Sequence, residues 1–401
     1  CAICWHALTH HLGAACKAVL STDTRMVCLA LATLQTLERR CGRLNSFLGK
    51  LKWPPLTQFY ACREFHTLPL RSCKAELQNL PKQKLEYLVG FFDGDGCVDH
   101  GSLSGGCGLK VAQSYDAAEV LLIYRQAFGG GIYLDGQRAR GLKKPGLVWS
   151  LRGIAAQRVA KILGELPSLK QPQLLLAASW STSHEHRIAS SNVMKSLKRE
   201  KPEHKLVCTW PYLAGFFDAE GCIRVKPLAA SIVLEVSQRD RAVLELIKDF
   251  LNHEIPNLSV GIYPTSNAFS LQVTNPKASK DILRRLLAAD LTTKRKEANV
   301  ALSVCPSSHV DVRCSLALLK GNQSKYRRLD AAGMLRAKAI NRLQSLRSHR
   351  RGCGGKDVSK LELDIVELQL NHAVCCAETR IACMRQDIRA LLGTGATVTT
   401  A

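Results

Sequence analysis

The sequence contains no uninterrupted apolar stretch long enough to cross a lipid bilayer, which argues against a protein held by membrane-spanning helices. Acidic residues are scarce, because 33 Asp and Glu stand against 56 Lys and Arg, and the formal net charge is +23. This balance favours a polyanionic partner, either nucleic acid or an anionic membrane surface, although a generally basic protein has the same balance. With no long apolar segment, we expect nucleic acid and no membrane.

The cysteines do not form the pattern of a disulfide-rich protein. They number 17, which is odd, and they are scattered over 401 residues, so we expect reduced thiols. Hydrophobic residues make up 46% of the chain, which is enough to bury a sizeable core. The length allows two or three domains.

The N-terminal region is also poor in acids. Residues 1–75 hold only Asp23, Glu38 and Glu64 against ten Lys or Arg. This composition is typical of an organellar targeting segment, although an arbitrary upstream extension has the same composition. We therefore expect residues 1–78 to be an N-terminal extension and the protein to reach a chloroplast or mitochondrion.

An internal repeat organises the middle of the chain. Residues 85–97 read Leu-Glu-Tyr-Leu-Val-Gly-Phe-Phe-Asp-Gly-Asp-Gly-Cys, and residues 210–222 read Trp-Pro-Tyr-Leu-Ala-Gly-Phe-Phe-Asp-Ala-Glu-Gly-Cys. Most of the paired positions are identical or nearly so, and the agreement continues downstream, for example between residues 111–113 and 236–238. Such a repeat predicts two copies of one structural unit.

Each copy has the pattern of an αββαββα unit. Apolar residues recur at helical spacing in residues 85–92 and alternate with other residues in 109–113 and 232–238, as in strands. Gly96 and Gly221 are expected to end the two motif helices.

We therefore predict an α+β fold. The two pseudo-symmetric repeats span residues 79–182 and 207–305. The stretch between them, residues 183–206, is rich in Ser, His, Lys and Glu, and we interpret it as an exposed linker. Residues 306–401 are expected to form a basic helical extension, in which residues 320–352 carry ten Lys or Arg and a single acid, Asp330.

Two nonapeptides inside the repeats are similar to the signature of a known family. Residues 88–96 read Leu-Val-Gly-Phe-Phe-Asp-Gly-Asp-Gly, and residues 213–221 read Leu-Ala-Gly-Phe-Phe-Asp-Ala-Glu-Gly. Residues 80–305 thus resemble a LAGLIDADG homing endonuclease with both motifs in one chain. The resemblance implies a double-strand break at a long, specific DNA site, an origin in intron homing, and a monomer that is sufficient for activity.

The small residues of the motifs and their last acids suit this arrangement. Gly90 with Gly94, and Gly215 with Ala219, place small residues four apart, so two helices can approach backbone to backbone. In the family, antiparallel DNA-binding sheets pack around two central motif helices, which contact each other, and the last acids of these helices lie side by side facing the DNA. Here those acids are Asp95 and Glu220.

Two adjacent carboxylates repel each other unless a cation lies between them. Mg²⁺, or Mn²⁺ in its place, prefers hard oxygen ligands and often takes only one or two carboxylates, with phosphate and water completing its shell. The expected metal set is Asp95 and Glu220 with the preceding Gly94 and Ala219. Such ions activate water and stabilise the leaving oxygen during displacement at phosphorus. Asp93 and Asp218 are interpreted as structural residues that bind backbone groups at the helix end, although a direct role in metal binding is the alternative.

A polar residue and a lysine follow each acid at matching distances. Gln113 and Gln238 each lie 18 residues after their acid, and Lys170 and Lys294 lie 57 and 56 residues further on. The resemblance implies that such residues line the solvent pocket beside the scissile phosphates, with Gln ordering water and Lys supplying positive charge. We therefore add these four residues to the expected catalytic set.

The strands after each motif are expected to enter the DNA major groove, where every base pair presents a distinct pattern of donors and acceptors. Polar residues of these strands and their loops are the candidates for contacting DNA, although each is also an ordinary surface residue type. They are Asp99, His100, Lys110, Arg138, Arg140, Arg224, Lys226, Glu235, Ser237, Asn267 and Gln272.

Three alternatives share this fold. An intron maturase would bind its group I intron RNA and assist splicing, a relative without catalysis would only bind DNA, and a decayed copy would do neither. Intact acids at both motif ends favour the nuclease, because binding alone does not require them.

Overall fold

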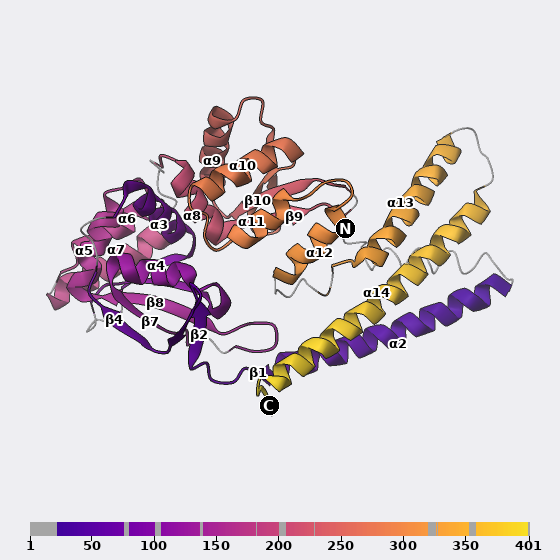
Figure 1. Cartoon of the computed structure of the whole chain (residues 1–401), viewed down its shortest axis with the longest axis horizontal. Helices are drawn as coiled ribbons and strands as arrows, with labels where there is room; N and C mark the ends of the chain where they lie inside the picture. Colours follow the sequence, from indigo (N-terminus) through magenta and orange to yellow (C-terminus); the bar gives the residue numbers. More distant parts are fainter. Residues whose placement is uncertain are drawn as a thin grey trace. The chain divides into compact units, whose positions relative to one another are not determined.

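The structure is a computed structural model that describes residues 22–75, 80–100, 106–136, 139–181, 183–199, 206–227, 229–319, 326, 328–352 and 358–399. It divides into two compact units. The first, here called the repeat unit, holds residues 54–139 and 143–320. The second, called the helical unit, holds residues 1–53, 140–142 and 321–401. Figure 1 shows the elements of both units.

The first repeat follows the predicted order of elements. Its helices and strands are α3 (Lys82–Asp95), β5 (Gly96–Asp99), β6 (Gly108–Ser114), α4 (Glu119–Phe128), β7 (Gly130–Leu134), β8 (Gly146–Arg152), α5 (Gly153–Gly164) and α6 (Gln171–Ala178). The strands pair antiparallel, and helices α4 and α5 pack against the sheet. The buried face of the sheet carries Val111, Trp149 and Ile132, which are neighbours in register and have no exposed area.

The second repeat has the same order. Its elements are α8 (Trp210–Glu220), β9 (Gly221–Val225), β10 (Ile232–Gln238), α9 (Arg241–Glu254), β11 (Val260–Pro264), β12 (Phe269–Val273), α10 (Pro276–Ala288) and α11 (Arg295–Leu302), followed by α12 (His309–Leu319). Its sheet has the strand order β11-β12-β10-β9. Leu234, Val236 and Leu271 are buried on the face that α9 and α10 cover. The α+β fold with two pseudo-symmetric αββαββα repeats is thus confirmed.

The region expected to be an extension also contributes to the first repeat. Strands β2 (Gln58–Ala61) and β3 (Glu64–Thr67) form a hairpin, and β4 (Leu70–Cys73) pairs with β7 at the edge of the first sheet. The sheet order is therefore β4-β7-β8-β6-β5. Phe59 is only 2% exposed and belongs to the common core of the repeats. Residues 54–75 are structural parts of the repeat unit, because they bury apolar side chains in that core.

The segment between the repeats also differs from the expected linker. Residues 184–199 form helix α7 (His184–Arg199), which contacts α6 and buries Met194 completely. The Ser-, His- and Lys-rich composition is that of the exposed face of a helix, and the single buried methionine lies on the other face.

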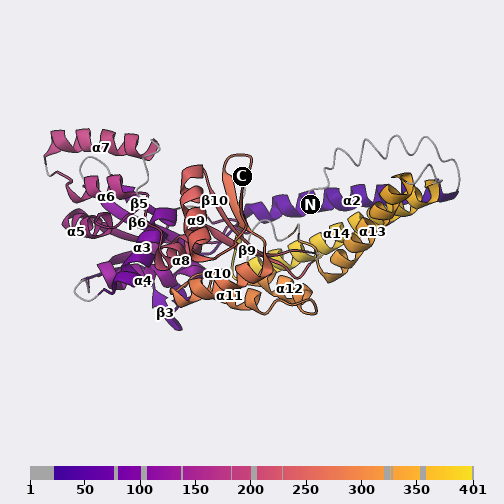
Figure 2. The same ribbon diagram turned by 90° about the horizontal axis from the view of Figure 1, so that it is seen from above.

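The helical unit combines segments that are far apart in the sequence. Helix α2 (Thr22–Lys50) and helix α14 (Ser359–Gly393) run parallel and side by side, as Figures 1 and 2 show, and α13 (Ala331–Gly352) packs against α14. Strand β1 (Leu51–Lys52) pairs with β13 (Thr397–Val398). The buried residues of the α2–α14 contact recur every seven positions, as in a coiled coil. They are Leu34, Cys41 and Leu48 on α2, and two series on α14, of which one is Leu370, Ala377, Met384 and Leu391 and the other is Ile381 and Ile388.

An ion pair supports this contact, since Nη1 of Arg380 lies 3.1 Å from Glu38.

The C-terminal part of the chain, residues 306–401, is helical as predicted. However, α12 belongs to the repeat unit, while α13 and α14 form the helical unit with α2. No helix among the described residues is long and apolar enough to cross a membrane.

Candidate active site

The two motif helices, α3 and α8, cross at the small residues predicted to allow a close approach. A Cβ atom added to Gly90 would overlap the carbonyl oxygen of Tyr212, and one added to Gly215 would overlap the carbonyl oxygen of Tyr87. A Cβ on Gly94 would in turn overlap the side chain of Ala219. The helices therefore approach with backbone against backbone, as predicted, and larger residues at these positions would separate them.

Glycine ends each motif helix for a steric reason. Gly96 and Gly221 have φ values of −78° and −76°, in the extended region that any residue adopts. A Cβ atom at either position would overlap the ring of the preceding phenylalanine, Phe92 or Phe217. The prediction that both helices end at these glycines is confirmed, but the glycines provide space for an aromatic ring and do not form a left-handed cap.

The two acids are the last residues of α3 and α8, so they lie at the same end of the crossed helices. Cγ of Glu220 comes within 3.2 Å of the position that a Cβ on Gly94 would take. Burial and the negative charge of Glu220 raise the pKa of Asp95 from 3.8 to about 6. Burial, and to a smaller extent the neighbouring charge, thus disfavour ionisation of Asp95 in the metal-free protein.

The glutamines of the two repeats differ in their contacts. Nε2 of Gln113, on β6, donates a hydrogen bond of 2.5 Å to Oδ2 of Asp95. Gln238 is half-buried at the end of β10, and among the described residues no matching hydrogen bond joins it to Glu220. Sequence spacing placed both glutamines at equivalent positions, but only the first contacts its acid.

Both lysines lie next to the ends of the motif helices. Nζ of Lys170 donates to the carbonyl oxygens of Phe92 at 2.8 Å and Gly96 at 2.5 Å, and lies 3.4 Å from that of Gly94. Nζ of Lys294 donates to the carbonyl oxygen of Asp218. Burial lowers the pKa of both lysines.

An ammonium group at this position offsets the partial negative charge of a helix C-terminus. Both lysines also interact favourably with Asp95, because each lowers the pKa of that carboxyl group. In the structure their hydrogen bonds go to helix carbonyls, so their place in a solvent pocket beside DNA stays a prediction.

The first acid of each motif is buried and fully hydrogen-bonded. Asp93 accepts bonds from the backbone N–H groups of Leu169 at 2.8 Å and Lys170 at 3.1 Å, and from Ser168 Oγ at 2.6 Å. Asp218 accepts bonds from the backbone N–H groups of residues 292–294 at 2.6–3.0 Å. These contacts support the structural interpretation, but the bound backbone belongs to the segment that carries the lysine and not to the end of the motif helix.

Sequence reasoning missed two further residues in this network. Tyr212 Oη donates to Asp93 Oδ2, and Tyr87 Oη donates to Asp218 Oδ2, both at 2.7 Å. Both tyrosines are buried, with exposed fractions of 0% and 2% for Tyr87 and Tyr212. Tyrosine occupies the same position in both copies of the repeated segment, and this recurrence is the signal that would have identified them.

The residues expected to contact DNA from the second sheet share its polar face, opposite the face covered by α9 and α10. Glu235 is paired in register with Gln272 on the neighbouring strand. Arg224 donates to Glu235 Oε2 from Nε at 2.9 Å and Nη2 at 2.5 Å, and Ser270 Oγ donates to Oε1 at 2.7 Å. Three further residues of this set, Lys226, Ser237 and Asn267, are exposed.

In the first sheet the expected residues are dispersed. Lys110 pairs with Asp99 at 2.5 Å, and Nδ1 of His100 lies 3.2 Å from Ser191 Oγ on α7. Arg140 belongs to the helical unit, where it forms a β-bridge with Lys52. Arg138 lies outside the described residues.

The donor set at the motif ends fits a hard divalent cation. It offers two carboxylates, whose mutual repulsion a cation would relieve, and Mg²⁺ commonly takes no more than two protein carboxylates when phosphate and water complete its shell. No group of three or more His, Cys, Asp or Glu side chains suited to a metal occurs among the described residues, so a site made entirely of protein side chains is not present there.

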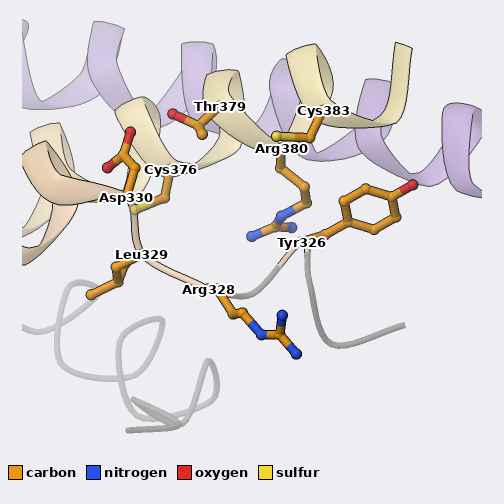
Figure 3. Close-up of a pocket in the computed structure, with 8 residues that line it drawn as sticks. All are labelled: Tyr326, Arg328, Leu329, Asp330, Cys376, Thr379, Arg380 and Cys383. Atoms are coloured by element: carbon orange, nitrogen blue, oxygen red, sulfur yellow. The ribbon is translucent and has the colours of Figure 1, made fainter. Parts of the chain in front are cut away.

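A pocket in the helical unit has a different chemical character (Figure 3). Its lining includes two thiols, Cys376 and Cys383, on one face of α14. The charged residues of its lining are Arg328, Asp330 and Arg380, and Arg380 already forms an ion pair with Glu38. This pocket contains no pair of carboxylates and is not a second copy of the motif site.

Comparison with known proteins gives one family match. Residues 213–300, which run from the second motif to α11, match the family model described as LAGLIDADG endonuclease. No curated protein sequence matches the chain.

Several solved structures show low similarity over most of their length. The meganuclease I-AabMI bound to uncleaved DNA is 16% identical with a TM-score of 0.43, and the alignment covers 59% of this chain and 94% of that one. The homing endonuclease I-GzeII in complex with its DNA target is 15% identical with a TM-score of 0.44, over 61% of this chain and 99% of that one. I-SmaMI bound to an uncleaved DNA target in the presence of calcium ions is 15% identical with a TM-score of 0.43, and the alignment covers 61% of this chain and 99% of that one.

The family match covers the second motif, its acid Glu220 and the segment with Lys294. The first repeat has the same order of elements and the same nonapeptide, and its motif helix packs symmetrically against α8. The resemblance inferred from the two nonapeptides is therefore confirmed, and residues 213–300 are similar to the LAGLIDADG endonuclease family.

Proposed function

We propose that this chain is a divalent-metal-dependent endonuclease that hydrolyses one phosphodiester bond in each strand of a long, specific DNA site. The observation that carries the proposal is the position of Asp95 and Glu220, which end two helices in backbone contact and interact through their charges. A binding protein without catalysis would not need this unfavourable pair of carboxylates.

Asp95 and Glu220 would hold Mg²⁺ or Mn²⁺ together with DNA phosphate and water, with the backbone of Gly94 and Ala219 completing this end of the helices. When bound, the metal supplies an activated water and neutralises charge on the phosphate. The hydrogen bond from Gln113 fixes the orientation of the Asp95 carboxylate. Lys170 and Lys294 place positive charge beside the acids, where it would stabilise the negative charge that develops at phosphorus.

The polar faces of the two sheets would bind the DNA. Arg224 presents a planar fork of donors on the second sheet, already oriented by Glu235, and this geometry suits recognition of guanine in the major groove. The net charge of +23 supports binding to a polyanion. A single chain supplies both acids, so we propose that a monomer is sufficient. Organellar localisation and an origin in intron homing stay predictions.

The proposal is tested with purified full-length protein and a plasmid library that contains randomised inserts and host-gene sequences. The library is incubated with Mg²⁺, with Mn²⁺ or with EDTA, and new double-strand ends are sequenced. We expect metal-dependent ends at one recurring long site. The double variant Asp95→Asn, Glu220→Gln is the matched control, because it keeps the shape of both side chains and removes both charges.

Ends from the wild type that are absent in the control establish the endonuclease. If folded wild-type protein makes no ends although the true insertion sequence is in the library, the proposed function is wrong. Binding of one DNA site without cutting would then identify a DNA-binding relative, and binding of intron RNA would identify a maturase.

A further inference from the structure

Two hydrogen bonds cross between the two motif helices of the repeat unit. Tyr87 of the first motif helix donates to Asp218 of the second, and Tyr212 of the second donates to Asp93 of the first, both at 2.7 Å. Each aspartate is at most 5% exposed, so solvent does not supply an alternative donor. The symmetry of the repeats therefore extends to a reciprocal exchange of one hydrogen bond.

Each aspartate also holds the backbone of the segment that ends in the active-site lysine of its own repeat. Asp218 accepts from the N–H groups of Thr292 and Thr293 through Oδ2, and from that of Lys294 through Oδ1 at 2.7 Å. Asp93 accepts from Leu169 through Oδ2 and from Lys170 through Oδ1. Each aspartate thus connects, through its hydrogen bonds, the tyrosine of one repeat with the lysine segment of the other.

The tyrosine hydroxyl shares an oxygen atom with these backbone donors. Oδ2 of Asp218 accepts from Tyr87 Oη and from the N–H groups of Thr292 and Thr293, and Oδ2 of Asp93 accepts from Tyr212 Oη and Leu169 N. Loss of the hydroxyl removes one of these donors in a buried site, where an incompletely hydrogen-bonded carboxylate is unfavourable. The carboxylate can then rotate, and the backbone segment that it holds moves with it.

From this geometry we propose that Tyr87 and Tyr212 are positioning residues, each of which fixes the active-site lysine of the opposite repeat. The chain of contacts runs from Tyr87 through Asp218 to Lys294, and from Tyr212 through Asp93 to Lys170. The inference deepens the proposed function and rests on it for its catalytic consequence: each half of the active site would be ordered only when the other repeat is correctly packed. Both DNA strands would therefore be cut only when α3 and α8 pack in this arrangement.

The positioning itself is tested without catalysis, by hydrogen–deuterium exchange of the full-length protein. Tyr87→Phe is expected to speed exchange at the backbone amides of residues 292–294 by about 10-fold, which corresponds to one lost hydrogen bond, and to leave residues 169–170 near the wild-type rate. Tyr212→Phe is expected to give the reverse pattern. Tyr124→Phe is the matched control, because Tyr124 is a buried tyrosine of the same core whose hydroxyl donates to the carbonyl oxygen of Leu88 and not to Asp93 or Asp218.

The catalytic consequence is tested on a duplex that carries the site selected in the library experiment, with a different fluorophore on each strand. Single-turnover cutting of each strand is followed on denaturing gels. Tyr87→Phe is expected to slow the same strand as Lys294→Met, and Tyr212→Phe the same strand as Lys170→Met. We expect slowing of about 10- to 100-fold, the scale of a small misplacement of a catalytic group.

A purely structural role would not be strand-specific, because loss of stability lowers the amount of active protein and slows both strands equally. Equal slowing of the two strands, or slowing of one strand by both Tyr87→Phe and Lys170→Met, would overturn the crossed assignment. If the wild type cuts neither strand, the proposed endonuclease function fails. The exchange measurement then decides alone: unchanged or uncrossed exchange refutes the positioning role.

Discussion

Replacing Asp95 by Asn should stabilise the metal-free protein at neutral pH. The pKa of this carboxyl group is about 6 in the folded chain against an ordinary value of 3.8, because of burial and the charge of Glu220. The folded state therefore binds a proton more tightly than the unfolded state. Its stability falls as the pH rises from about 4 to about 6, and the loss is complete above the folded-state pKa.

The size of the effect follows from the pKa difference of about two units. At 1.36 kcal/mol per unit, ionisation of Asp95 costs the folded state about 3 kcal/mol at pH 7.5. Asn keeps an oxygen that accepts the hydrogen bond from Gln113, so the variant loses the charge and little else. Asp95→Asn should thus be more stable than the wild type by up to about 3 kcal/mol at pH 7.5 and nearly equal to it at pH 4.

The measurement is urea unfolding in EDTA at pH 7.5, 5.5 and 4, followed by tryptophan fluorescence, to which the buried Trp149 of the first repeat contributes. Asp99→Asn is the control, because Asp99 is a partly exposed carboxylate paired with Lys110, and its loss should change stability by less than about 1 kcal/mol. A metal-free Asp95→Asn variant that is no more stable than the wild type at pH 7.5 would refute the strained carboxylate pair. Added Mg²⁺ should stabilise the wild type more than the variant.

Two further predictions concern packing and thiol reactivity. Gly90→Ala or Gly215→Ala should destabilise the protein by more than about 2 kcal/mol, because the new methyl group overlaps a backbone carbonyl of the opposite helix. Gly42→Ala, which meets no atom within 4 Å in the middle of α2, should instead stabilise it by about 0.5–1 kcal/mol, and urea midpoints compare the three. Hydrogen bonds from Ser307 and Ser308 lower the pKa of the exposed Cys305 thiol to about 7. Its alkylation rate, measured by peptide mass spectrometry, should therefore rise through a midpoint near pH 7. Ser308→Ala should move that midpoint upward, and an unchanged midpoint would contradict the assigned cause.

Much of the site could be predicted from the sequence because its signals are local and repeated. Small residues four positions apart, such as Gly90 and Gly94, mark a helix face that another backbone can approach. The acids that end the two motifs, Asp95 and Glu220, follow from the resemblance of the two nonapeptides to the family signature. The strands could also be predicted from the sequence, because alternation of buried and exposed residues is a property of neighbouring positions.

The sequence also contains a second regular pattern, a spacing of seven between apolar residues. Leu34, Cys41 and Leu48 on α2 are spaced by seven, and so are Ala377 and Met384 on α14. This spacing predicts helices that pair along a narrow seam. It does not name the partner, because many apolar seams are compatible with one another, and the segments lie more than 300 residues apart in the chain.

What the sequence by itself determined is the set of local structures: two repeats, two motif helices, two acids, and the face that each strand buries. Only the tertiary structure determined which of these elements and side chains contact one another. In it, β4 pairs with β7 at the edge of the first sheet, and Lys170 donates to a carbonyl oxygen at the end of α3. Tyr87 donates to Asp218, and Tyr212 donates to Asp93. Periodicity depends on a few neighbouring residues, whereas a hydrogen bond between residues 131 positions apart depends on how two complete surfaces meet.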